Sequence, residues 1–225
     1  MKDKIESYYK PLIEHYTPQD TRFVSWLTKN NQDLRFFQLI DNIEFSFNSV
    51  LDVGCGVGDF WEYLNAVGHC NVSDYKGIDI LPKMIEGAKS KFNYIEDKFE
   101  CIDVFDYFIT HDYCVSTGAI SVRLFEDDEE QKSYGYNFID KLHSLSNKAF
   151  VINFLSDYTD ERVKTNELFY YTPELMYTYC KMNYGNVKLI SDYGDGLNED
   201  DCSGEQRTKM NCALASADRL HMHYS

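Results

Sequence analysis

Short apolar runs alternate along this chain with stretches in which apolar residues recur every three or four positions. Such runs are typical of buried strands, and the longer spacing is typical of helices with one buried face. The runs cover residues 49–53, 74–79, 99–104, 112–117, 149–156 and 186–193. The helical stretches cover residues 60–67, 82–92, 126–145 and 173–182. Strands that alternate with helices predict an α/β fold with a doubly wound, mostly parallel sheet.

The residues before the first strand carry an amphipathic helical pattern of their own. Residues 1–45 contain two or three helical stretches, with Pro11 and Pro18 as breaks, and the clearest apolar face lies at 34–43. We expect these residues to form an N-terminal helical cap ahead of a core that spans residues 46–193.

The first strand ends in an acid that is followed by alternate glycines. Asp52 precedes Gly54, Gly56 and Gly58. Glycine suits a turn with unusual backbone angles, and it lets a ligand lie against bare backbone. A dinucleotide-binding loop, G-x-G-x-x-G, would need its third glycine at position 59, where Asp59 stands. The spacing therefore disfavours an NAD-dependent oxidoreductase.

A second acid supports a nucleotide-like ligand. Asp79 ends the next predicted strand about 20 residues beyond the loop, where related folds place a ribose-binding carboxylate. The pattern D-x-G-x-G-x-G resembles motif I of the class I S-adenosylmethionine-dependent methyltransferases. The leader around 8–13 and 32–36, and the Y-Y-x-P pattern at 170–173, are similar to a small bacterial and phage-type subgroup of that family.

The resemblance implies a Rossmann-like methyltransferase fold, with S-adenosylmethionine as cofactor and S-adenosylhomocysteine as product. It implies that the methionine end lies over the glycine turn, the ribose on Asp79 and the adenine amino group on Asp103. Arg35 or Gln32 is the candidate for the methionine carboxylate, for which arginine offers a planar fork. The positions assigned to the cofactor are Asp52, Gly54, Cys55, Gly56, Gly58, Asp79, Ile80, Asp103, Val104, Ser116, Thr117, Gly118 and Arg35.

Ordinary structural roles stay open for several of these positions. Asp103 suits a cap after its strand, because Asp favours such positions. Residues 116–118 either end their strand with capping interactions or line the space beside the sulfonium methyl. Arg35 either meets the cofactor or lies on a solvated helix face.

Composition and charge narrow the range of partners. A chain of 225 residues with 44% apolar residues suits one α/β domain. The formal net charge of −15 repels polyanions, and no stretch is long and apolar enough to span a bilayer, so we expect neither nucleic acid nor membrane partners. Seven scattered cysteines without a C-x-x-C pair, and a start without an apolar targeting segment, favour a cytoplasmic protein with reduced thiols. The acidic run at 126–130 is interpreted as the first turn of a helix, and no metal is expected.

We therefore expect in-line methyl transfer to a small-molecule acceptor. Positioning of the acceptor supplies most of the rate, and a general base is needed only if the acceptor must lose a proton. No histidine falls at the end of a predicted central strand, which leaves Asp157, Tyr158 and Tyr171 as candidates for that base. The alternative is a non-catalytic module of the same fold that binds the cofactor or a partner.

The end of the chain differs from the family pattern, which implies an antiparallel seventh strand. Residues 194–207 have almost no apolar content, and residues 208–220 favour at most a weak helix. We therefore divide the chain into a methyltransferase domain, 1–193, and an atypical tail, 194–225, with the seventh strand in doubt. A missing strand would expose the edge beside the sixth strand, which predicts a monomer or a homodimer paired through that edge.

Overall fold

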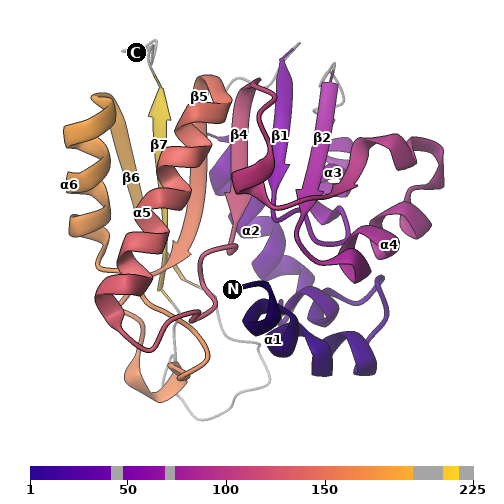
Figure 1. The fold of residues 1–225 in the computed structure, drawn as a ribbon, viewed down its shortest axis with the longest axis horizontal. Helices are drawn as coiled ribbons and strands as arrows, with labels where there is room; N and C mark the ends of the chain where they lie inside the picture. The colour runs from indigo at the N-terminus through magenta and orange to yellow at the C-terminus, as the bar shows by residue number, and fades with distance from the viewer. Residues whose placement is uncertain (42–47, 69–73, 195–209, 218–225) are drawn as a thin grey trace.

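The computed structural model describes residues 1–41, 48–68, 74–194 and 210–217 (Figure 1). These residues contain a seven-stranded sheet of order β3-β2-β1-β4-β5-β7-β6, in which β7 is antiparallel to both of its neighbours and the other pairs are parallel. The strands are β1 (Ser49–Val53), β2 (Asp74–Asp79), β3 (Phe99–Cys101), β4 (His111–Thr117), β5 (Ser146–Leu155), β6 (Val187–Gly194) and β7 (Met210–Ala217). The predicted doubly wound, mostly parallel sheet is confirmed.

Helices cover both faces of this sheet. They are α1 (Lys2–His15), α2 (Lys29–Ile40), α3 (Asp59–Ala66), α4 (Pro82–Lys91), α5 (Asp128–Leu145) and α6 (Pro173–Tyr184), with short 3-10 turns η1 (Thr21–Val24), η2 (Asn93–Lys98), η3 (Val104–Asp106) and η4 (Glu161–Val163). Side chains of α2, α3 and α4 pack with Val50 on one face, and those of α5 and α6 pack with Leu51 and Val53 on the other. This alternation of apolar contacts along β1 follows from the two-residue period of a strand. Among the described helices, none combines the length and the apolar content that a membrane span requires.

The strand order reverses between β1 and β4. From β1 the chain proceeds outward to β2 and β3, and it then returns to β4 on the other side of β1. The segments that leave the carboxyl ends of β1 and β4 therefore diverge, and open α/β sheets bind their ligands in the crevice this creates. In Figure 1, α1 lies at this end of the sheet.

The N-terminal residues form the expected helical cap, although the predicted break at Pro11 is wrong. Pro11 lies inside α1, and none of the residues of that helix is fully buried. Proline removes one helical hydrogen bond and crowds the preceding turn, but water can solvate the carbonyl groups on a surface helix. Pro18 falls in the turn between α1 and η1.

The doubt about a seventh strand is also wrong. β7 lies between β5 and β6, and it pairs antiparallel with Ala149–Leu155 on one side and with residues of β6 on the other. The sheet is therefore complete, and the residues set apart as an atypical tail supply one of its strands. β6 remains the outer strand, since β7 is its one partner among the described residues. The rest of the predicted tail, 195–209 and 218–225, lies outside the described residues.

Candidate active site

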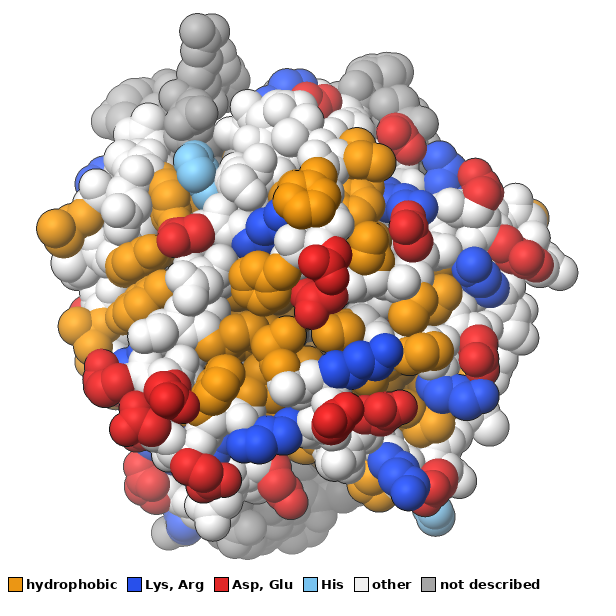
Figure 2. Space-filling view, in the orientation of Figure 1, with side chains coloured by type: hydrophobic (Ala, Val, Ile, Leu, Met, Phe, Trp, Pro, Cys, Tyr) orange, Lys and Arg blue, Asp and Glu red, His pale blue; other side chains and the backbone are white. Residues whose placement is uncertain are grey.

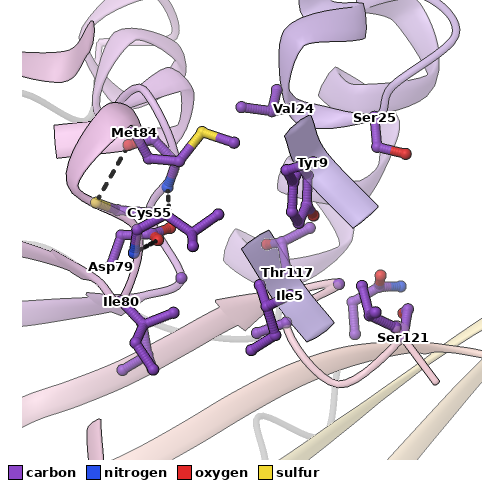
Figure 3. Close-up of a pocket in the computed structure, with 18 of the residues that line it drawn as sticks. Ile5, Tyr9, Val24, Ser25, Cys55, Asp79, Ile80, Met84, Thr117 and Ser121 are labelled. Atoms are coloured by element: carbon purple, nitrogen blue, oxygen red, sulfur yellow. Dashed lines mark hydrogen bonds between the residues drawn. The ribbon is translucent and has the colours of Figure 1, made fainter. Parts of the chain in front are cut away.

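A cavity opens at the carboxyl ends of the parallel strands, between the sheet and the N-terminal cap (Figure 3). Its wall includes the glycine turn after β1, the ends of β2 and β4, and residues from α1, η1 and α2. The predicted cofactor residues that line it are Asp52, Gly54, Cys55, Gly56, Asp79, Ile80, Asp103, Val104, Thr117, Gly118 and Arg35. Gln32, the alternative to Arg35, also lines it. Two predicted residues, Gly58 and Ser116, do not.

The glycine turn requires glycine for two different reasons. Gly54, Gly56 and Gly58 all have positive φ, at 74°, 54° and 82°, where other residues are strained. A Cβ at Gly56 would lie 3.0 Å from Val24 of the cap, so glycine at this position lets the turn pack closely against η1. A Cβ at Gly58 would lie 2.9 Å from Phe92. Gly58 is therefore needed for packing behind the turn, and its predicted contact with the cofactor is not supported.

Asp79 is tied to the glycine turn. Its Oδ2 accepts a hydrogen bond from the backbone N–H of Gly56 at 3.0 Å, and its Oδ1 accepts one from the N–H of Leu81 at 2.8 Å. Burial raises the pKa of Asp79 to about 6, against these backbone donors, which lower it. The backbone N–H of Ile80 also lowers this pKa. A carboxylate has about four acceptor positions, so Asp79 keeps acceptor capacity for the hydroxyls of a ligand such as a ribose.

Asp52 lies deeper in the same wall. It is 3% exposed, and its Oδ2 accepts a hydrogen bond from the hydroxyl of Tyr75 at 2.7 Å. Burial raises its pKa to about 7; the bond from Tyr75 lowers it, and the nearby charges of Asp79 and Asp59 raise it further. The acid in front of the glycines is thus a buried group that Tyr75 holds in place under the turn.

Asp59 is a lining residue for which sequence reasoning assigned no role. Its Oδ2 accepts from Nε2 of Gln32 at 2.8 Å, and its Oδ1 accepts from Nζ of Lys91 at 2.6 Å. Gln32 belongs to the cap helix α2, Asp59 to the first turn of α3 and Lys91 to the end of α4. The carboxylate therefore connects the cap to the core at the glycine turn.

Arg35 does not lie on a solvated face. It is 3% exposed, it lines the cavity, and its guanidinium lies 4.2 Å from the ring centroid of Trp26. Trp26 also lines the cavity, and a Cβ at Gly118 would lie 3.9 Å from its ring. The indole therefore spans from the cap to the loop after β4. No role was assigned to Trp26 from the sequence.

Asp103 has the capping role that its sequence allowed, and it also borders the cavity. Its Oδ1 accepts from the N–H of Phe105 at 3.0 Å and so caps η3, while the residue also lines the cavity.

Ser116, in contrast, is fully buried and donates its hydroxyl to the carbonyl of Val53 at 2.9 Å. Ser116 therefore joins β4 to β1, whereas Thr117 and Gly118, which were predicted with it, line the cavity.

None of the three residues proposed as a general base lines the cavity. Asp157 accepts a hydrogen bond from the hydroxyl of Thr172 at 2.5 Å, and the hydroxyl of Tyr158 donates to Glu174 at 2.8 Å. Tyr171 is 2% exposed, and its hydroxyl lies 3.4 Å from the carbonyl oxygen of Ile120. Burial raises its pKa further above the ordinary tyrosine range. The structure thus gives these side chains stabilising contacts away from the site.

Comparison with known proteins agrees with this geometry. A family model described as a methyltransferase domain matches residues 25–159. A protein of Mycobacterium tuberculosis that is named as a methyltransferase, Rv1506c, is 34% identical over 148 residues, which are 65% of this chain and 87% of that protein.

Solved structures share the fold at low sequence identity. Magnesium protoporphyrin IX methyltransferase from Synechocystis PCC 6803, with bound S-adenosylhomocysteine, has a TM-score of 0.62 at 14% identity and covers 95% of this chain and 94% of its own. The plantazolicin methyltransferase BpumL, in complex with a pentazolic desmethylPZN analogue and S-adenosylhomocysteine, has a TM-score of 0.57 at 18% identity. The match covers 97% of this chain and 96% of BpumL. The family model covers more than half of the chain, and its match includes the glycine turn and Asp79. The chain therefore belongs to this methyltransferase family and is an S-adenosylmethionine-dependent methyltransferase.

Proposed function

We propose that this methyltransferase acts on a small organic molecule and that it holds its cofactor across the cavity from Arg35 to Asp103. In this arrangement Arg35 binds the methionine carboxylate, Asp79 accepts from the ribose hydroxyls and Asp103 accepts from the adenine amino group. The observation that supports it most is the hydrogen bond from Gly56 to Asp79, since it joins the bare turn to a carboxylate with acceptor positions to spare.

The residues of the site serve to bind and orient. S-adenosylmethionine, when bound, supplies a methyl group on a positively charged sulfur. Thr117 and Gly118 at the end of β4 border the space beside it, and Trp26 covers that space from the cap. In-line transfer then depends mainly on how closely the acceptor is held against the methyl, and a fixed geometry can supply most of the rate. Because the predicted bases lie elsewhere, no proton transfer through them is proposed.

A small acceptor is favoured over nucleic acid by the charge of the protein. The formal net charge is −15, and Figure 2 shows Lys and Arg side chains interspersed with Asp and Glu over the face in view rather than gathered into a patch. Two structural neighbours are named for a porphyrin and for plantazolicin, whereas another is in complex with the Trm112 methyltransferase activator. The fold alone thus admits several acceptors, and we propose the small molecule because of the charge. A cytoplasmic location, and either a monomer or a homodimer through the edge of β6, stay predictions.

The family match speaks against the non-catalytic alternative. A missing seventh strand would have favoured that alternative slightly, and β7 is present in the sheet. The NAD-dependent reading is overturned by the family.

Titration calorimetry tests the proposed function. S-adenosylmethionine and S-adenosylhomocysteine are expected to bind, and NAD is not. Gly56→Val should abolish binding, because its branches would meet Val24 and fill the space above the turn. Gly185→Val serves as a control, because Gly185 also has positive φ but lies outside the cavity, and no atom in the described part of the chain lies within 4 Å of an added Cβ. Binding of NAD with neither adenosyl compound would overturn the assignment.

A further inference from the structure

The cavity has two chemically different ends (Figure 3). Cys55, Asp79 and Met84 lie at one end, Ser25 and Ser121 lie at the other, and Thr117 lies between them. The inference that follows rests on the proposed function, in which the first end takes the adenosyl part of the cofactor. The second end is then the space for the methyl acceptor.

Carboxylates dominate the charge of this cavity. The charged side chains among the described lining residues are Asp52, Asp59, Asp79, Asp103 and Arg35. The pKa of Asp52 is raised to about 7 by burial, and the charges of Asp79 and Asp59 add to that effect. The field inside the cavity therefore opposes a further negative charge. Met1 also lines the cavity and is 44% exposed, so it forms a solvated part of the wall.

Flat and apolar side chains form the wall at the acceptor end. Trp26 approaches Gly118, and one face of its ring is covered by the guanidinium of Arg35. Leu168 and Val122 form an antiparallel bridge, and both line the cavity. Leu27, next to Trp26, is 67% exposed and adds apolar surface at the entrance. A flat molecule would bury apolar area against this wall and stack with the indole.

We propose that the acceptor is an uncharged or cationic molecule with a flat apolar body, and that carboxylates and phosphates are excluded. Arg35 contacts Trp26 and binds the methionine carboxylate, so the described wall has no further Lys or Arg side chain to offer an anionic acceptor. An anion there would lose part of its hydration without gaining a further Lys or Arg side chain of the described wall as a counter-charge, and the four carboxylates that line the rest of the cavity would repel it. The cavity thus discriminates against anionic acceptors by charge repulsion as well as by its shape.

Fluorescence of Trp26 can report on the acceptor end directly. The chain has two tryptophans, and Trp61 does not line the cavity. Trp61→Phe keeps an aromatic ring against Tyr75 and leaves Trp26 as the one indole. The variant is saturated with S-adenosylhomocysteine and titrated with phenethylamine, phenethyl alcohol and phenylacetate. These probes share a phenyl ring and differ in charge.

We expect phenethylamine and phenethyl alcohol to bind about tenfold more tightly than phenylacetate, a difference of about 1.4 kcal/mol. Leu27→Lys, which adds a cation at the wall, should strengthen phenylacetate binding. Phe37→Lys adds the same charge at a position that is 45% exposed and outside the cavity, and it should leave the order unchanged. Equal or tighter binding of phenylacetate, or no binding of any probe to a protein that binds S-adenosylhomocysteine, would overturn the inference. Failure to bind S-adenosylhomocysteine would overturn the proposed function itself, and this inference with it.

Discussion

The backbone N–H of Gly56 donates to Oδ2 of Asp79 at 3.0 Å, and this bond joins the turn after β1 to the carboxyl end of β2. The second oxygen of Asp79 is fixed by the N–H of Leu81. The chain itself thus orders a carboxylate beside bare backbone, which is how a site reduces the cost of organising itself around a ligand. The predictions below test this arrangement and the contacts that support it.

The two roles of Asp103 can be separated by one substitution. Asn caps a helix as well as Asp does, so Asp103→Asn should keep the bond to Phe105 and leave the melting temperature within about 2 °C of the parent. The amide has lost the negative charge, and its NH₂ faces the amino group of adenine. Affinity for S-adenosylhomocysteine should therefore fall by about 1 to 3 kcal/mol in calorimetry. Unchanged affinity would restrict Asp103 to its capping role.

The stability of the protein should depend on pH through Asp52. Its pKa is raised to about 7, so between about pH 4 and pH 7 the native state holds a proton that the unfolded chain has lost. Native stability therefore falls as pH rises through this window. Asp52→Asn cannot ionise, and its advantage over the parent should grow by about 2 to 3 kcal/mol from pH 5 to pH 8.

Denaturant unfolding at the two pH values measures this difference. Asp41→Asn, at an exposed position, provides the control and should not change the pH dependence to a similar extent. If Asp52→Asn and the parent show the same change with pH, then Asp52 is ionised in the native state throughout the range.

The ion pair between Lys91 and Asp59 should be worth far more than an exposed one. Their side chains are 13% and 10% exposed, whereas those of Lys83 and Glu86, which form a pair of the same length, are 65% and 61% exposed. Lys91→Met should cost about 3 kcal/mol, because it leaves a nearly buried carboxylate without its cation. Lys83→Met should cost less than about 0.5 kcal/mol. Equal losses in chemical denaturation would show that Asp59 is solvated in solution.

Gly58 and Gly68 offer a matched test of packing behind the glycine turn. Their φ angles are 82° and 78°, so the backbone strain of an alanine is nearly the same at both. A Cβ at Gly58 meets Phe92 and Phe99 at 2.9 Å, whereas a Cβ at Gly68 has no atom of the described residues within 4 Å. Gly58→Ala should therefore be less stable than Gly68→Ala by about 1 to 3 kcal/mol, the usual range for overpacking. Similar melting temperatures for the two variants would contradict this account.

Local patterns predicted those parts of the fold that depend on neighbours in sequence. The apolar run of β1 and the alternate glycines after it are sufficient to predict a buried strand and a turn with positive φ. β7 could not be predicted in this way. Met210–Ala217 is rich in alanine, which favours a helix, but hydrogen bonds to β5 and β6 on both sides outweigh that preference.

Contacts between residues far apart in sequence explain why Tyr171 does not line the cavity and why no role was assigned to Asp59. The ring of Tyr171 fits the core because Gly135, in α5, leaves room for it, since a Cβ there would lie 2.7 Å from the ring. No pattern around Tyr171 contains that information. Asp59 was noticed only because it replaces a glycine, and its contacts come from Gln32 and Lys91 on two other helices.

Paired removal of Asp79 and of the ribose hydroxyls tests the central claim most directly. Calorimetry compares S-adenosylhomocysteine with its 2′-deoxy and 3′-deoxy analogues on the parent protein and on Asp79→Ala. If Asp79 accepts from the ribose, each missing hydroxyl should weaken binding to the parent by about 1.5 to 3 kcal/mol, and binding to Asp79→Ala by much less. An equal loss of affinity on both proteins would contradict the account, because the ribose would then be bound elsewhere in the cavity.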